Sequence, residues 1–443
     1  MAAAQAHAGQ HKWNFGAGPA MIPRPVLERA QAEFLNYQST GLSLMELSHR
    51  SQPYEDLNNK AQAQLRQLLN VPDNYKIIFM QGGGHTQFAA VVYNLIAWRH
   101  HQNGAKGDWR QIPVDYVVTG SWSAKAAEEA KRLGANLRVV CDAKKVLGAY
   151  TGIPAEETWA TSDPQGATRQ ADAEAGQKPA YLYYCDNETV NGVEFPFVPS
   201  LHDPAVPLVC DMSSNILSRP VDVSKFGVIY AGAQKNIGPA GVSVVIIRED
   251  LLQTSELKDG LQPVPLMLDY KTMVKNNSLY NTPPMFAIYM SSLVFDWLLD
   301  PSAQRVQDGD ASIYPHSSFV GVEAAQARNE RKASKLYKAL EDSRFCRIVV
   351  QDKAARSKMN IPFRISATPK GDSSATTDKK KDEEMEAAFV AQAEAKGLLQ
   401  LAGHRSVGGI RASIYNAMTE EGVDVLIAYL KEFESQYKIG GEV

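Results

Sequence analysis

Short apolar runs alternate with longer segments of mixed polarity through the first two thirds of the chain. Four of these runs are rich in β-branched and aromatic residues and predict buried strands: 75–80, 114–120, 180–185 and 207–212. The segments 86–98 and 123–134 carry apolar residues at helical spacing and predict helices. Strands that alternate with helices indicate an α/β fold, with a mostly parallel sheet covered by helices on both faces. In such sheets, ligands bind at the carboxyl ends of the strands.

The pattern changes near residue 300. The segment 281–300 predicts a long apolar helix, with Thr282 as its N-cap and Pro283 in its first position. Beyond it, three helices and two strands are predicted, in the order 319–341, 347–352, 361–366, 383–396 and 419–437. We therefore expect three parts: a flexible tail at 1–12, a large domain at 13–300 whose first residues pack with the small domain, and a small α+β domain at 301–443.

Two segments hold few apolar residues and predict surface insertions. They are 161–178 and 367–384. The second contains the run Lys379–Lys381, which is typical of a solvated loop rather than of a binding patch.

Composition and charge restrict the choice of partner. The 46 Lys and Arg residues nearly balance the 49 Asp and Glu residues, which favours neither nucleic acid nor a membrane as partner. No apolar run approaches the roughly 20 residues of a membrane span, and the N-terminus lacks the pattern of a secretory signal. The four cysteines show no metal-binding or dithiol spacing, so we expect reduced thiols, no metal site and a cytoplasmic protein.

A lysine stands between two predicted strands in VIYAGAQKNIGPAGVSVVI, residues 228–246. Small and turn-forming residues surround Lys235, which places its amine at a strand end with little bulk beside it. Asp211 follows the apolar run 207–210 directly, where a carboxylate needs a cationic partner. The two residues could form a buried ion pair, or they could hold a ligand between them.

Three glycines, Gly82–Gly84, separate a predicted strand from a predicted helix. They indicate either a tight turn or a phosphate cradle, because a helix N-terminus offers free N–H groups and a partial positive charge. The segment matches neither a Walker loop nor the dinucleotide pattern, which argues against a nicotinamide-dependent dehydrogenase.

Pyridoxal phosphate would use all of these groups together. It needs a lysine amine for its aldehyde, an acid for its ring nitrogen, a helix N-terminus for its phosphate and an aromatic ring against its own. Lys235, Asp211, Gly84 and Trp122 supply them. The conjunction predicts a pyridoxal-phosphate site.

Two stretches pair histidine with arginine. One contains His49 and Arg50, and the other contains His404, Arg405 and Arg411. Arginine binds carboxylate and phosphate through two parallel hydrogen bonds. The two stretches therefore indicate a substrate with two anionic ends.

Six motifs carry a family resemblance that runs from Trp13 to Phe433: NFGAGPAMIP, ELSHRS, GGGHTQFAAV, CDMSSNILSRPVDVSKFGVIYAGAQKNIGPAG, NTPPMFAIY and GHRSVGGIRASIYNAM. The chain resembles the phosphoserine aminotransferase family of the class V aminotransferases. The resemblance implies the fold type I architecture of pyridoxal-phosphate enzymes and a homodimer. It also implies conversion of 3-phosphohydroxypyruvate and glutamate to phosphoserine and 2-oxoglutarate, a step of serine biosynthesis.

The resemblance also assigns roles to residues. It implies that Lys235 is the Schiff-base lysine, that Asp211 pairs with the ring nitrogen and that Trp122 stacks on the ring. It further implies that Thr189 lies beside the ring oxygen and that the cofactor phosphate is held by Gly84, His85 and Gln234, with Asn281 and Thr282 reaching it from the other subunit. For the substrates, it implies that Arg411 binds the α-carboxylate. The substrate phosphate or the glutamate side chain would be bound by His49, Arg50, His404 and Arg405.

The chain departs from the bacterial pattern at His85-Thr86, where bacterial members carry Arg-Gly. A histidine is only partly charged near neutral pH, so its part in binding the substrate phosphate stays open. Two alternatives also remain: another class V aminotransferase, and a non-enzymatic protein on the same fold. A cysteine desulfurase is disfavoured, because no cysteine lies in a glycine-rich basic loop.

Overall fold

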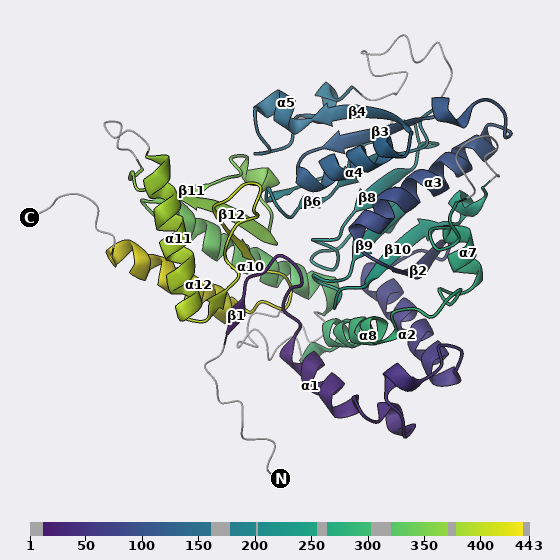
Figure 1. Cartoon of the computed structure of the whole chain (residues 1–443), viewed down its shortest axis with the longest axis horizontal. Helices are drawn as coiled ribbons and strands as arrows, with labels where there is room; N and C mark the ends of the chain where they lie inside the picture. The colour runs from purple at the N-terminus through teal and green to yellow at the C-terminus, as the bar shows by residue number, and fades with distance from the viewer. Residues whose placement is uncertain are drawn as a thin grey trace, which may run out of the picture.

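One seven-stranded sheet forms the centre of the larger part of the molecule (Figure 1). The computed structural model describes residues 12–160, 178–200, 203–254, 264–302, 320–370 and 378–436. The strand order is β2-β10-β9-β8-β5-β3-β4. The strands are β2 (Tyr75–Gln81), β3 (Pro113–Val118), β4 (Asn136–Asp142), β5 (Leu182–Cys185), β8 (Leu208–Asp211), β9 (Val228–Gly232) and β10 (Val242–Arg248). Strand β10 runs antiparallel to both of its neighbours and the other pairings are parallel, which confirms the predicted mostly parallel sheet.

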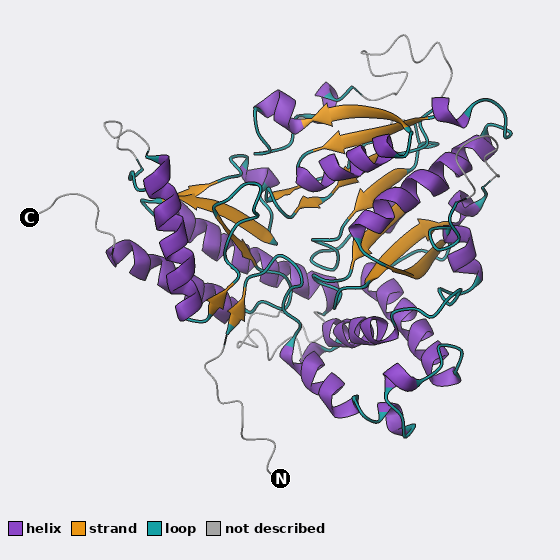
Figure 2. Cartoon of the chain, viewed as in Figure 1, coloured by secondary structure: helices purple, strands orange, loops and turns teal. Residues whose placement is uncertain are grey.

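Helices cover both faces of this sheet, as Figure 2 shows. One face packs against α3 (Gly84–Gln102), α4 (Ser121–Arg132) and α7 (Tyr270–Lys275), and the other against α1 (Arg24–Glu33), α2 (Gln52–Leu69) and α8 (Met285–Leu299). Successive side chains of a strand point to opposite faces, so β2 contributes to both cores. Ile77 and Phe79 pack in the core with α2 and α8, whereas Ile78 and Met80 pack in the core with α3.

A smaller part of the molecule contains a three-stranded antiparallel sheet. Its strands β11 (Cys346–Ile348), β12 (Asn360–Ile365) and β14 (Ile410–Ser413) pair in the order β11-β12-β14. The helices α10 (Gly321–Asp342), α11 (Lys379–Ala395) and α12 (Glu420–Gln436) pack with it around a third apolar core. Strand β1 (Trp13–Asn14) pairs with β13 (Leu398–Leu399), and the Trp13 and Phe15 side chains enter this third core.

The remaining elements are short. A hairpin joins β6 (Asn187–Glu188) to β7 (Val193–Glu194), and α5 (Ala143–Leu147) follows β4. The 3-10 turns are η1 (Tyr37–Ser39), η2 (Leu44–Glu46), η3 (Trp109–Gln111), η4 (Glu156–Thr158), η5 (Val223–Lys225), η6 (Glu249–Leu252) and η8 (Lys353–Ala355). Within the described ranges, no helix has both the length and the apolar character needed to cross a membrane.

The prediction that Thr282 caps the long apolar helix is wrong. Helix α8 begins at Met285, its N-cap is Pro284, and no side chain bonds to its first turn. The cause is the pair Pro283 and Pro284, because a residue that precedes proline is disfavoured in the helical conformation. The helix therefore starts only after the second proline.

The prediction of a solvated loop at Lys379–Lys381 is also wrong. These lysines form the first turn of α11, because the Asp378 side chain accepts hydrogen bonds from the backbone N–H groups of Lys380 and Lys381. The other part of that insertion, 371–377, lies outside the described residues, as do 161–177 of the first insertion and 1–11 of the predicted tail.

Candidate functional site

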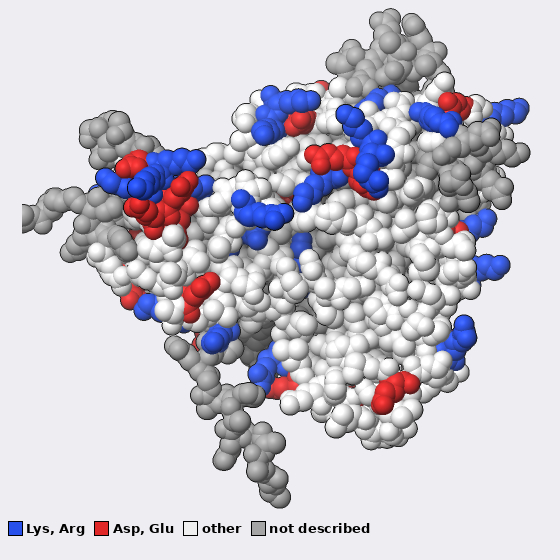
Figure 3. Space-filling view, viewed as in Figure 1, with Lys and Arg blue, Asp and Glu red and all other residues white. Residues whose placement is uncertain are grey.

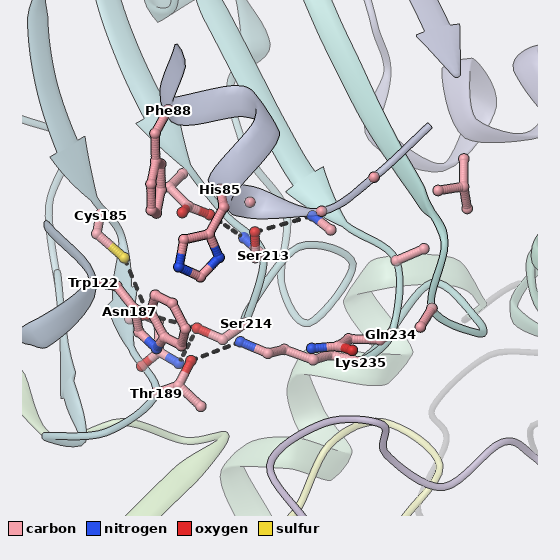
Figure 4. A pocket seen from close by; sticks show the side chains of 18 of the residues that line it. His85, Phe88, Trp122, Cys185, Asn187, Thr189, Ser213, Ser214, Gln234 and Lys235 are labelled. Carbon is pink, nitrogen blue, oxygen red and sulfur yellow. Dashed lines mark hydrogen bonds between the residues drawn. The ribbon is translucent and has the colours of Figure 1, made fainter. Parts of the chain in front are cut away.

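A cavity of about 360 Å³ opens at the carboxyl ends of the central strands. Figure 3 shows Lys and Arg side chains along the border of a hollow on the face viewed. The wall of the cavity contains seven residues that the sequence assigned to the cofactor: Gly84, His85, Trp122, Thr189, Asp211, Gln234 and Lys235. They come from five separate segments of the chain, and Figure 4 labels the His85, Trp122, Thr189, Gln234 and Lys235 side chains among them.

Lys235 lies in the turn that follows β9. The backbone N–H groups of Lys235 and Gly238 both bond to the carbonyl of Ala233, which makes this turn tight. The Lys235 Nζ donates to Thr189 Oγ1 at 2.7 Å, the contact drawn as a dashed line in Figure 4. Burial lowers the pKa of the amine to about 8, although the Asp211 carboxylate opposes this shift. A substantial fraction of the amine is therefore neutral near pH 8, and a neutral amine is a nucleophile and a base.

Asp211 is the last residue of β8, and the adjacent strand β9 leads into the Lys235 turn. Its side chain is buried, and its Oδ1 accepts a hydrogen bond from the Ser213 backbone N–H at 2.8 Å. Burial raises the pKa of the Asp211 carboxyl group, while the bonds from Ser213 and the charge of Lys235 act in the opposite direction. The carboxylate thus faces the cavity as a partner for a cationic ligand atom.

The N-terminus of α3 forms another wall of the cavity. Gly82 has a φ of 108°, and a Cβ there would lie 2.3 Å from Thr86 Oγ1, so this position requires glycine. Helix α3 begins at Gly84, and the N–H groups of Thr86 and Gln87 bond to the Gly83 carbonyl, so the Gly84 and His85 N–H groups before them have no acceptor within the helix. A Cβ built on Gly232 would lie 3.5 Å from the Gly84 nitrogen and 3.8 Å from Ser213 Oγ, so the backbone at the end of β9 lies close to this end of the helix. The arrangement suits an anionic group.

Aromatic rings line the side of the cavity next to α3 and α4. Trp122 lies in the first turn of α4, and the His85 ring lies 5.4 Å from it, edge to face. The His85 ring also lies 5.3 Å from the Phe88 ring. Lys125 covers the Trp122 ring, with its Nζ 4.7 Å from the ring centroid. A flat ligand ring can therefore stack on an indole at this wall.

The structure also brings in residues that the sequence reasoning missed. Cys185, Asn187, Ser213 and Ser214 line the cavity, and the Ser213 Oγ accepts a hydrogen bond from the Gly232 backbone N–H. The two serines follow Asp211 closely in DMSSN, so hydroxyl groups directly after a strand-end acid were a usable signal. No local sequence pattern pointed to Asn187, because its hydrogen-bond partner Asn360 lies 173 residues away in sequence.

Arg411 lies on β14, next to the cavity lining but not part of it. Its Nη1 donates to the Thr189 carbonyl at 3.4 Å. Its Nε is buried and, among the described residues, has no hydrogen-bond partner. Burial lowers the pKa of this guanidinium. An arginine that has an unused, buried N–H donor beside the cavity can bind an anionic ligand.

His404 and Arg405 lie in the loop before β14. The His404 Nδ1 bonds to Ser406 Oγ, and burial and the charges of Arg411, Lys125 and Arg405 lower the pKa of His404. Arg411, Lys125 and Arg405 therefore each act electrostatically on His404. Arg405 itself is exposed.

The remaining predicted residues form a separate group away from the cavity wall. Thr282 Oγ1 lies 3.2 Å from His49 Nδ1, and Asn281 bonds to Gln81 Oε1. Arg50 is exposed beside His49. Within one chain, these four residues do not reach the cavity that contains Lys235.

The searched part of the chain contains no group of three or more His, Cys, Asp or Glu side chains that could hold a metal ion. All four cysteines are free and buried. The cavity itself presents an amine, a carboxylate, a helix N-terminus and an aromatic wall.

The chain is similar to a known family of proteins over nearly its whole length. The chain matches the Aminotransferase class-V family over residues 12–426. The chain belongs to the class-V aminotransferase family.

Curated relatives of the chain carry the name phosphoserine aminotransferase. The protein of Laribacter hongkongensis is 43% identical over 426 residues, which cover 96% of this chain and 99% of that protein. The protein of Azotobacter vinelandii is 45% identical and covers 96% of this chain and 98% of that protein. The resemblance predicted from the motifs is confirmed.

Solved structures of similar proteins share the fold. Phosphoserine aminotransferase from Bacillus circulans subsp. alkalophilus superposes with a TM-score of 0.77 at 41% identity, and covers 96% of this chain and 99% of that one. The pyridoxal-phosphate-bound enzyme from Trichomonas vaginalis superposes with a TM-score of 0.75 at 37% identity, and covers 95% of this chain and all of that one. The predicted fold type I architecture is confirmed.

Proposed function

We propose that this chain is a phosphoserine aminotransferase. It transfers an amino group from L-glutamate to 3-phosphohydroxypyruvate and yields 2-oxoglutarate and O-phospho-L-serine, a step of serine biosynthesis. The observation that carries the proposal is the meeting of Lys235, Asp211 and the N-terminus of α3 around one cavity. The near full-length identity of 43% and 45% to proteins of that name supports it.

The residues of the cavity fit pyridoxal phosphate. When bound, this cofactor supplies an aldehyde that takes up an amino group and a protonated ring that accepts the electron pair released at the substrate α-carbon. Lys235 supplies the amine for the aldehyde, and Asp211 supplies the buried carboxylate for the ring nitrogen. The free N–H groups of Gly84 and His85, with the Gln234 side chain, would hold its phosphate. Trp122 would stack on its ring, and the Thr189 hydroxyl would serve the ring oxygen.

Lys235 also moves the proton. Because burial lowers the pKa of its amine to about 8, the neutral form is available as a base without extreme pH. Its Nζ removes the proton from the α-carbon of glutamate and later returns a proton at the carbon that carries the transferred amino group. The same steps run in reverse on the keto acid.

The anionic ends of the substrates require cationic side chains. Arg411 is suited to the α-carboxylate that both substrates share, because its buried Nε is free among the described residues. His404 and Arg405 are suited to the second anionic end, either a phosphate or the side-chain carboxylate of glutamate. The nearness of Lys125 to these groups adds positive charge to the same region.

A second copy of the chain completes the site in this proposal. Asn281, Thr282, His49 and Arg50 form one group outside the cavity of their own chain. In a homodimer they serve the site of the partner, with Asn281 and Thr282 at the cofactor phosphate. His49 and Arg50 then meet the distal anion of the substrate.

We also place the protein in the cytoplasm. The support is that its four cysteines are free and buried, as suits a reducing compartment.

Visible absorption of the purified protein tests the function. Protein reconstituted with pyridoxal phosphate is expected to be yellow. Its band is expected to bleach with glutamate and to return with 3-phosphohydroxypyruvate. A band that ignores glutamate but responds to another amino acid would assign the chain to a different class V reaction. The absence of any band after reconstitution would contradict the cofactor assignment.

Arg411→Ala is expected to weaken the binding of both substrates. Loss of a charge-assisted, two-pronged contact raises each KM by about 10-fold to 100-fold, whereas the absorption of the bound cofactor stays unchanged. Steady-state kinetics with each substrate varied in turn measures this. Arg347→Ala is the control, since this arginine on β11 bonds to backbone carbonyls outside the cavity. An effect on one substrate alone would contradict the α-carboxylate role.

A further inference from the structure

A buried carboxylate joins two walls of the cavity. Glu188 is the last residue of β6 and is 0% exposed. Its Oε2 accepts the Trp122 backbone N–H at 2.8 Å, and its Oε1 accepts the Ser123 backbone N–H at 2.8 Å and the Ser123 hydroxyl. The residue after it is Thr189, which holds the Lys235 amine. One side chain thus connects the helix that carries Trp122 to the segment that carries Thr189.

We propose that Glu188 is a positioning residue that fixes the Trp122 ring and the Thr189 hydroxyl relative to Lys235. The proposal rests on the function proposed above. Glu188 does not line the cavity itself, so it acts through its two neighbours.

The start of α4 is built around this carboxylate. The N-cap of α4 is Gly120, which has no side chain to accept the first free N–H groups. A Cβ at position 120 would lie 2.4 Å from Glu188 Cγ and Cδ, so the glycine leaves room for the glutamate. Glu188 therefore caps the helix from another segment, 66 residues away from Trp122 in sequence. A negative charge at this helix end is also favoured by the helix dipole.

The same hairpin is anchored on its other sides. Asn191 accepts from the Ser121 backbone N–H and hydroxyl, and Asn187 donates to Ser214 and to Asn360 of β12. These bonds place the segment between β8, α4 and the small sheet. Of all the hydrogen bonds described for this hairpin, it is a bond to Glu188 that involves the Trp122 backbone.

The Glu188 carboxyl group also has an electrostatic effect, in addition to its place in the packing. Burial raises the pKa of Glu188, and the three donors around it oppose that rise. The Lys235 amine also feels this carboxylate, which favours its protonated form. Loss of the Glu188 charge thus alters both the geometry and the electrostatics beside the lysine.

The test compares Glu188→Gln with Glu194→Gln. The amide keeps the size of the side chain but turns one acceptor oxygen into a donor that faces a backbone N–H. Glu194 is the matched control: it is a buried carboxylate on the same hairpin that accepts the Lys358 backbone N–H at 2.8 Å and does not line the cavity.

Two readouts are expected to separate the variants. In the apoprotein, hydrogen exchange of the Trp122 and Ser123 amides quickens by about 10-fold or more in Glu188→Gln and stays unchanged in Glu194→Gln. In the reconstituted protein, the Kd for pyridoxal phosphate rises about 10-fold in Glu188→Gln alone, and the visible circular dichroism of the bound cofactor changes.

Other results would overturn the proposal. Equal effects of the two variants would reduce Glu188 to a stabilising residue, and unchanged exchange and Kd in Glu188→Gln would remove its role altogether. If Glu188→Gln does not fold, Ser123→Ala removes one of the three donors and is expected to raise the Kd about 3-fold; an unchanged Kd there would also contradict the proposal. A wild-type chain that fails to bind pyridoxal phosphate would instead refute the function, while the exchange result would still decide the link between Glu188 and Trp122.

Discussion

Lys235→Ala is expected to abolish transamination, with kcat reduced by at least about 10³-fold. The reason is that the amine has two tasks: it holds the cofactor aldehyde and it carries the proton at the substrate α-carbon, and general base catalysis alone contributes about 10²-fold to 10⁴-fold. A glutamate half-reaction followed by stopped-flow absorption measures the loss directly. A small primary amine added to the solution should restore part of the proton transfer.

This variant should fold as well as the wild type does. The replaced amine is desolvated and donates one side-chain hydrogen bond, to Thr189, so its removal relieves a burial cost. An unfolding temperature that is unchanged or higher is therefore expected. Lys271→Ala, at an exposed position of α7, controls for loss of a lysine elsewhere. A Lys235→Ala protein that transaminates at a rate close to wild type would end the assignment of this residue and of the proposed mechanism.

Asp211→Asn is expected to reduce kcat by about 10²-fold to 10³-fold. Removal of one preorganised electrostatic contact from an enclosed active site reduces kcat by about this factor. The amide keeps the shape of the side chain and can still accept the Ser213 backbone N–H. The amide can no longer keep the cofactor ring nitrogen protonated, so the ring would withdraw electron density from the substrate α-carbon less strongly. Single-turnover kinetics with glutamate measures this step apart from product release.

The same substitution should shift a second quantity. The Asp211 carboxylate raises the pKa of Lys235, so its neutralisation should move that pKa below the value of about 8. The rate of cofactor capture by the apoprotein, measured against pH, reports the change. Asp108→Asn is the control, because asparagine serves equally well at this exposed N-cap. A kcat within about 3-fold of wild type would place the ring partner elsewhere.

Local patterns in the sequence determined much of this protein. The apolar runs and helical spacings located the central strands β2, β3, β5, β8, β9 and β10 and the helices α3, α4 and α8, because burial on one face or both sets the period of the side chains. They did not predict strand β4 or the helices α1, α2 and α7. Small residues around Lys235 and the acid at the end of 207–211 identified the two reactive groups, since a charged residue in such a place needs a partner. The motifs then identified the family.

The first residues of helices were harder to predict from the sequence. Thr282 has the residue type of an N-cap, but the two prolines after it delay α8 to Met285. The lysine run of α11 has a loop-like composition, but the Asp378 side chain satisfies two free N–H groups and starts the helix there. In both cases a single neighbouring residue overruled the average tendency of the segment.

The tertiary structure alone decided how the groups meet. Strand β10 runs antiparallel between β2 and β9, which brings the N-terminus of α3 beside the end of β9 although the two segments are far apart in sequence. Glu188 reaches α4 across 66 residues, and Arg411 reaches Thr189 across 222. The sequence by itself determined which residues could react and which segments could form the sheet. Their distances, the burial that lowers the pKa of Lys235 and the cap that Glu188 places on α4 depend on contacts between remote segments, and no local pattern encodes such contacts.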